Sequence, residues 1–135
     1  MSTEIKAAVK WLIEMIAWRS ICVYDPDGEY DGIPVHNEIS LLDLANFGRE
    51  LIKTLKIKYE NHWYDEESTR DQAYRAIHIS PKYPVNEFFL EAAKNANVRY
   101  EALGIHDMTL TIWIDPGKVT GRYADNDPMF VIEEW

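Results

Sequence analysis

The order of the hydrophobic patterns along this chain constrains its fold most, because helical spacing comes first and strand alternation is concentrated late. Between Thr3 and Trp18, apolar side chains recur three and four residues apart, as on one face of a helix. Thr109–Asp115 instead has the β-branched and aromatic residues of a strand. The remaining expected elements are helices over 40–59, 86–97 and 98–104, and strands over 74–80, 119–124 and 129–134. This order without regular βαβ alternation predicts an α+β fold. We expect a single compact domain whose N-terminal helices pack on a mainly antiparallel sheet that ends in a C-terminal hairpin.

Two of these segments carry local expectations that the structure can test. The helix over Ser40–Tyr59 is expected to break near Asn46–Gly48, because glycine is a poor helix former. Strand alternation over 74–80 assigns side chains to opposite faces of the sheet. One face is expected to hold Tyr74, Ala76 and His78, and the other Arg75, Ile77 and Ile79.

The charge balance limits the classes of partner. The 135 residues include 14 basic and 23 acidic side chains, a formal net charge of -9, whereas a protein that binds a phosphate backbone needs a basic face. The one basic cluster, Arg49, Lys53, Lys56 and Lys58, fits a solvated helix face better. The sequence therefore favours protein partners and makes direct RNA binding a minor alternative.

The acidic stretch at about residues 24–38 is expected to be a surface loop inserted into a domain that spans 1–135. Its Asp-Pro-Asp-Gly and Asp-Gly-Ile-Pro runs are turn chemistry. Counted from Asp25, the positions where a calcium loop needs glycine and glutamate hold Tyr30 and His36, so no calcium site is expected. The single cysteine, Cys22, allows no intramolecular disulfide and fits a reducing compartment.

No arrangement of residues indicates catalysis. The sequence has neither a glycine-rich phosphate loop nor paired metal-ligand spacing, and its four histidines are scattered. Asp65, Glu66 and Glu67 are consecutive carboxylates on a polar stretch, where solvation is the more common reason for such a run. We therefore expect no enzyme, no catalytic residues, no metal and no cofactor.

Aromatic side chains at the ends of expected elements are the most informative feature. Tyr59, Trp63, Tyr64, Tyr74 and Trp113 lie among charged residues, as the anchors of protein interfaces do. We expect Trp63 to belong to the core and Tyr74 and Trp113 to face a partner.

Two motifs then indicate a family. Lys58-Tyr59-Glu60-Asn61-His62-Trp63-Tyr64 followed by Tyr74-Arg75-Ala76-Ile77 resembles the first signature box of the BTG/Tob antiproliferative family. Leu110-Thr111-Ile112-Trp113-Ile114-Asp115-Pro116 with Val119 is similar to the second. The chain departs from the family pattern at Asp71-Gln72-Ala73, where small glycine-rich residues are usual, and at Gly117, where an aromatic is common.

The resemblance implies a non-enzymatic adaptor. Family members bind the CAF-type catalytic subunit of the Ccr–Not deadenylase, link it to messenger-specific RNA-binding proteins, and so promote mRNA decay, translational repression and restraint of proliferation. The implied partner-binding residues are Tyr74, Trp113, Asp115 and Pro116, and the structural residues of the first box are Tyr59, His62 and Trp63. Residence in the cytoplasm, the nucleus or both is implied as well. The alternative is a self-associating or other protein-binding module that has lost the deadenylase contact.

Overall fold

A computed structural model describes residues 1–21 and 39–135, and for residues 20 and 21 the backbone alone. The acidic insertion expected at about 24–38 and Cys22 therefore lie outside the described residues. The helices are α1 (Ser2–Ile21), α2 (Leu41–Tyr59), α3 (Glu87–Asn95) and the 3-10 helix η1 (Tyr100–Leu103). The strands are β1 (Ala76–Ile79), β2 (Leu110–Asp115), β3 (Lys118–Arg122) and β4 (Phe130–Glu134).

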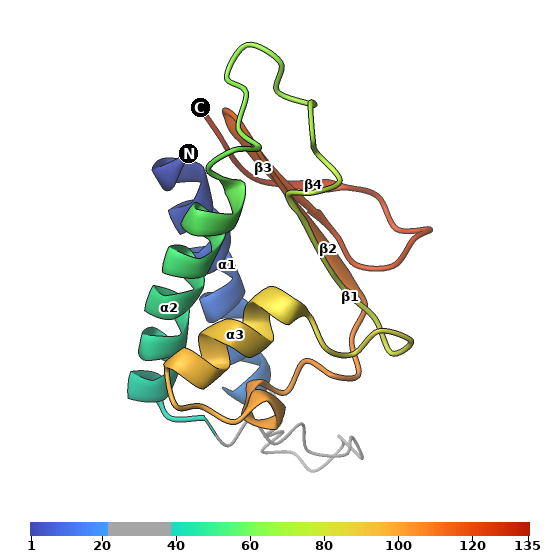
Figure 1. The fold of residues 1–135 in the computed structure, drawn as a ribbon. Helices are drawn as coiled ribbons and strands as arrows, with labels where there is room; N and C mark the ends of the chain where they lie inside the picture. The colour runs from blue at the N-terminus through green and yellow to red at the C-terminus, as the bar shows by residue number, and fades with distance from the viewer. Residues whose placement is uncertain (22–38) are drawn as a thin grey trace.

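The four strands form one antiparallel sheet in the order β1-β2-β3-β4. The helices lie on one side of it, as Figure 1 shows. The α+β class, the antiparallel sheet and the C-terminal hairpin of β3 and β4 are thus as predicted. Strand alternation turns Leu110, Ile112 and Ile114 of β2 into the core, where each is fully buried. The opposite side of the sheet, which we call the outer face, carries Trp113 near its middle.

Helix α1 lies between the sheet and α2, and it contacts β2, β3 and β4 as well as α2. A helix in such a position needs apolar side chains on more than one side. Its fully or almost fully buried residues are Ile5, Ala8, Val9, Leu12 and Ile16, and Trp11, Ile13 and Met15 pack against them. The helix extends a few residues beyond the expected range.

The expected break in α2 is wrong, because the helix is continuous through Gly48. A Cβ atom at Gly48 would meet Ile13 Cγ1 at 3.1 Å and Val9 Cγ1 at 3.5 Å across the contact with α1. The glycine therefore allows two helices to approach closely and does not interrupt one.

The strand expected over 74–80 is shorter than predicted, although its alternation is confirmed. The backbone N–H groups of Tyr74 and Arg75 donate to the carbonyl of Asp71 at 3.0 and 3.2 Å. This turn delays regular sheet pairing until Ala76. On the core side Arg75, Ile77 and Ile79 are buried, while His78 is exposed.

Candidate functional site

Arg75 is the centre of the segment that connects α2 to β1. Its side chain is 0% exposed although it carries a charge, and its guanidinium has five N–H donors. Each is used once, which is how a buried charge becomes tolerable. The acceptors are the carbonyls of Ile114 (2.8 Å), His62 (2.6 Å), Ser68 (2.9 Å) and Arg70, and the Asp115 carboxylate (2.9 Å). Arg75 therefore joins the connecting segment to the end of β2.

Asp115 is the anionic partner of Arg75 and is 8% exposed. Its Oδ1 accepts from Arg75 Nη2, and its Oδ2 accepts from the side-chain amide of Gln72. Gln72 belongs to the segment in which this chain departs from the family pattern. Both carboxylate oxygens of Asp115 are thus occupied within the chain.

Two rings of the first motif complete this framework. Tyr59 is fully buried, and its hydroxyl donates to the Arg75 carbonyl at 2.9 Å; its burial raises the pKa of the Tyr59 phenol. Trp63 is half-buried and packs against the core. Its indole N–H donates to Asp65 Oδ1 at 3.0 Å, and the Arg75 guanidinium lies 5.4 Å from its ring centre.

Tyr74 is 42% exposed and is held in place by His62. The two rings stack with centres 3.7 Å apart and planes 20° from parallel. His62 Nδ1 in turn lies 3.0 Å from Asp71 Oδ2, and Asp71 has a left-handed φ of 57°. A ring fixed by a stack loses little freedom on binding, which suits Tyr74 to an interface.

Trp113 lies half-buried on the outer face, between small neighbours. Ala76 of β1 and Thr120 of β3 are its cross-strand partners. The guanidinium of Arg122 is 5.3 Å from the Trp113 ring centre, within the range of a cation–π contact. On the same face, His78 Nδ1 and Thr111 Oγ1 are 2.7 Å apart. No helix of the described residues covers this face (Figure 1).

The Pro116–Gly117 turn joins β2 to β3. Gly117 has a φ of 82°, which favours glycine, and Pro-Gly at the centre of a tight turn is typical of type II geometry. Its N–H donates to the Glu4 carboxylate at 3.1 Å, and its carbonyl accepts from Trp135 N–H at 2.9 Å. A residue with a Cβ atom would be strained at this positive φ. The backbone conformation therefore favours glycine over an aromatic residue at position 117.

Glu4 ties α1 to this turn. Burial alone would raise the pKa of its carboxyl, but the Gly117 N–H bond and the Met1 amine, 3.1 Å away, outweigh burial and lower that pKa.

The pairing of β1 with β2 brings together the two chain segments that carry the predicted partner-binding residues. Pairing begins at Ala76 opposite Trp113, and Tyr74 lies in the turn just before Ala76. Asp115 and Pro116 follow Trp113 along β2 and into the next turn. The roles of Gln72 and Arg122 were not predicted, because they depend on contacts between distant segments that no local pattern reveals.

The described residues contain no cluster of three or more metal-ligating side chains. Among them, no helix combines the length and apolar character needed to cross a membrane.

Known proteins place this arrangement in a family. A model of the BTG family matches residues 30–133, most of the chain. The chain belongs to the BTG family. It is 33% identical to mouse protein BTG3 over 97 residues, which cover 72% of this chain and 38% of that protein. The Xenopus laevis maternal B9.10 protein is 34% identical over 97 residues (72% and 40%), and human Tob1 31% over 99 (73% and 28%). The matched region thus spans well under half of these relatives.

The BTG fold itself is also seen in a solved structure. The BTG/Tob domain of FOG-3 from C. elegans superposes with a TM-score of 0.69 at 18% identity, covering 100% of this chain and 83% of that one. Residues of both motifs discussed above lie within the matched BTG region.

Proposed function

We propose that this BTG-family chain is a non-enzymatic adaptor that binds the CAF-type catalytic subunit of the Ccr–Not deadenylase. Through that contact it promotes mRNA deadenylation, translational repression and restraint of proliferation or control of cell fate, in the cytoplasm, the nucleus or both. The observation that carries the proposal is the position of Trp113. It is a large, half-buried ring on a sheet face that no described helix covers, and Tyr74, stacked on His62, lies in the turn that leads into the neighbouring strand β1.

The chemistry of this face supports a protein partner. Aromatic side chains at the centre of a patch supply most of the binding energy of many interfaces. Ala76 and Thr120 beside Trp113 are small, so the indole is the prominent feature that a partner pocket could enclose. Arg122, stacked over the ring, adds a donor for a carboxylate or carbonyl of the partner.

Within this proposal Asp115 has a positioning role. Its carboxylate is occupied by Arg75 and Gln72, so it holds the Tyr74 segment against β2. Pro116 continues the same edge into the turn. The partner then contacts chiefly Tyr74, Trp113 and the rim around Pro116.

The test is a calorimetric titration of the 135-residue chain with a purified CAF-type deadenylase subunit. Trp113→Ala and Tyr74→Ala should each weaken binding by about 2 kcal/mol or more, roughly 30-fold, as expected for interface anchors. Trp18→Ala and Tyr83→Ala are matched controls, because these rings are 66% and 60% exposed and lie outside the proposed contact. All four variants should show cooperative unfolding by circular dichroism. Equal losses in the controls, or no binding by a folded wild type, would defeat the proposal.

Self-association is the alternative that the fold keeps open. Strand β4 lies at the edge of the sheet, and Val131 and Met129 are exposed there. The exposed Glu133 and Glu134 oppose pairing of two such edges, since like charges would meet. Light scattering over a concentration series distinguishes the two functions, because the adaptor reading predicts a constant mass.

Direct RNA binding is the third possible function. It is disfavoured because residues of the basic cluster already have partners within the chain. On α2, Lys53 pairs with Glu50 at 3.2 Å and Arg49 donates to Asn46 at 3.2 Å. If this cluster bound RNA, the affinity would fall steeply as the salt concentration rises. We expect no salt-dependent RNA binding by this chain.

A further inference from the structure

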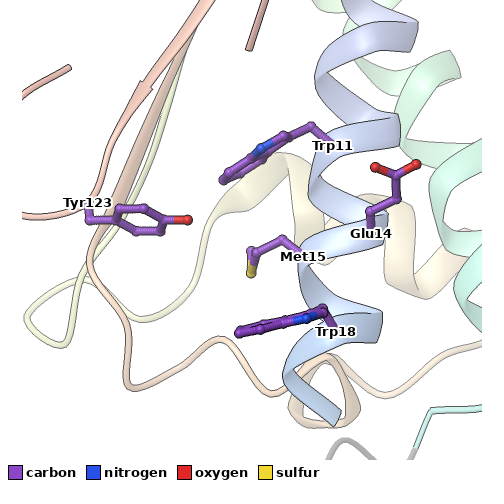
Figure 2. A pocket seen from close by; sticks show the side chains of 5 residues that line it. All are labelled: Trp11, Glu14, Met15, Trp18 and Tyr123. Carbon is purple, nitrogen blue, oxygen red and sulfur yellow. The ribbon is translucent and has the colours of Figure 1, made fainter. Parts of the chain in front are cut away.

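A second surface lies between α1 and the chain that follows β3. It is an open groove of about 310 Å³, lined by Trp11, Glu14, Met15, Trp18 and Tyr123. Figure 2 shows both indoles projecting from the same side of α1, with the Met15 thioether between them and the Tyr123 ring facing from across the groove. We call this the aromatic groove. It contains none of the residues proposed above to contact the deadenylase.

The residues of the groove are spaced by the helix. Trp11, Met15 and Trp18 stand at i, i+4 and i+7, which places them on one face of α1. At a rise of about 1.5 Å per residue, the two tryptophans lie about 10.5 Å apart along the axis. Trp11 is braced by Phe130, whose ring centre is 5.5 Å away, and by Tyr123 at 6.4 Å. Trp18 is 66% exposed, so packing of the described core does not account for it.

The groove offers hydrogen-bond donors beside apolar ring faces. The indole N–H groups of Trp11 and Trp18 and the hydroxyl of Tyr123 make no hydrogen bond to any described residue. An indole N–H can only donate. A matching ligand therefore needs apolar groups to cover the rings and carbonyl acceptors without partners of their own.

We infer that the aromatic groove binds a proline-rich segment of a partner protein in the polyproline II conformation. Such a segment repeats every three residues with a rise of about 3.1 Å, so equivalent prolines stand about 9.3 Å apart. That repeat is close to the two-turn spacing of Trp11 and Trp18. Its carbonyls carry no internal hydrogen bonds, and proline has no N–H that would require an acceptor from the groove. Aromatic grooves exploit this preformed conformation.

Charge indicates what flanks the prolines. Glu14 is the one charged side chain in the lining, which contains no Lys or Arg. Two nearby cations are paired elsewhere, Arg19 with Asp107 at 3.1 Å and Arg122 with Asp125 at 3.6 Å, and Lys10, one turn before Glu14 on α1, is not part of the lining. With a net charge of -9 on the chain, the favoured ligand carries an arginine or lysine beside its prolines.

The proline-rich ligand does not come from the described residues of a second copy of this chain. Pro81 and Pro84 have the right separation in sequence, but a tight turn holds Pro81 and ends just before Pro84. Ser80 and Tyr83 exchange backbone hydrogen bonds across it at 3.0 and 3.3 Å. The segment that joins the two prolines is therefore not extended.

The aromatic groove and the outer face can be occupied together. Arg122, the last residue of β3, lies over Trp113 on the outer face. Tyr123, the next residue, contacts Trp11 on the helix side. One chain can thus hold the deadenylase on one face and a proline-rich protein on the other.

The test is fluorescence anisotropy with a labelled peptide of about a dozen residues, with proline at every third position and a flanking arginine. A control peptide replaces the prolines with alanine at unchanged charge. The 135-residue chain should bind the proline peptide saturably, and at least about tenfold more tightly than the control peptide, because each tenfold corresponds to about 1.4 kcal/mol. Trp18→Ala should weaken binding by about tenfold or more. Glu14→Gln should weaken it by about two- to fivefold, the range of an exposed ion pair.

Matched variants make the result decisive. Trp135→Ala removes another exposed indole outside the groove (53% against 66% for Trp18), and Trp113→Ala alters the other surface; both should bind the peptide as the wild type does. Unchanged binding by Trp18→Ala, or equal binding of the alanine peptide, would overturn the inference. So would sedimentation that shows self-association abolished by Trp18→Ala without any peptide binding, since a second copy would then fill the groove.

Discussion

Replacing Arg75 by methionine should destabilise this protein more than any change at an exposed cation. The substitution keeps much of the side-chain volume but removes five N–H donors. The Asp115 carboxylate loses its cation, and the carbonyls of Ile114, His62, Ser68 and Arg70 lose their donor. Removing one partner of a buried ion pair costs about 3–5 kcal/mol. The free energy of unfolding of a small domain is about 5–15 kcal/mol. We therefore expect Arg75→Met to remove a large fraction of it.

The assay is urea unfolding followed by far-UV circular dichroism, with the free energy taken from linear extrapolation. In thermal unfolding the same loss should lower Tm by roughly 10–20 °C for a domain of this size. Arg70→Met is the matched control, because that side chain is exposed and pairs with Glu67 at the surface, which is worth less than about 1 kcal/mol. Adding Asp115→Asn to Arg75→Met should recover part of the loss, since no unpaired charge remains buried. An Arg75→Met variant within about 1 kcal/mol of wild type would refute this account of the connecting segment.

Three further substitutions probe the framework. Glu4 has a lowered pKa in the folded chain, so its contribution to stability is present above its ordinary value of 4.5 and is lost as pH falls through the lowered value. Glu4→Gln should therefore show a shallower loss of unfolding free energy between pH 7 and pH 3; an identical slope would contradict this. Gly117→Ala should lower the free energy of unfolding in urea by about 1–3 kcal/mol, because its φ of 82° strains a residue with a Cβ atom. Steric overlap is not the cause, since no atom lies within 4 Å of the position of that Cβ. Gly48→Val should cost about 1–3 kcal/mol by the same assay through overpacking against Ile13, and an unchanged midpoint would show that α1 can move aside.

The sequence predicted most of the fold because most of its signals are local. Helical spacing located the helices, and strand alternation correctly separated Ile77 and Ile79 from His78. The same alternation grouped Arg75 with the buried residues. A charged residue at a core position is a signal of an internal network, although its acceptors cannot be read from neighbouring positions.

The features that were not predicted depend on contacts between distant segments. Gly48 looked like a helix breaker, because the nearness of Ile13 on another helix is invisible in a local window. Residue 74 looked like the start of a strand, because the turn to the Asp71 carbonyl left no pattern of its own. The aromatic groove needs Tyr123 to face Trp11 from the other end of the chain.

The site shows a similar division. The motifs predicted Tyr74 and Trp113 as partner-binding residues, and the structure leaves Tyr74 exposed and Trp113 half-buried on the outer face. Asp115 was predicted to bind the partner as well, but it is 8% exposed and paired with Arg75, so we propose that it positions the neighbouring segments. Gln72 and Gly117, which depart from the family pattern, each have a structural role in this chain.

The central claim is that Trp113 faces the deadenylase, and the indole N–H signals of the five tryptophans test it most directly. The 135-residue chain, labelled with ¹⁵N, is titrated with a CAF-type deadenylase subunit, and each indole signal is assigned by a Trp→Phe variant. We expect the Trp113 signal to shift or broaden early in the titration, while the Trp18 signal in the aromatic groove stays in place. A shift of Trp18 with Trp113 unchanged would move the interface to the helix side and contradict the account.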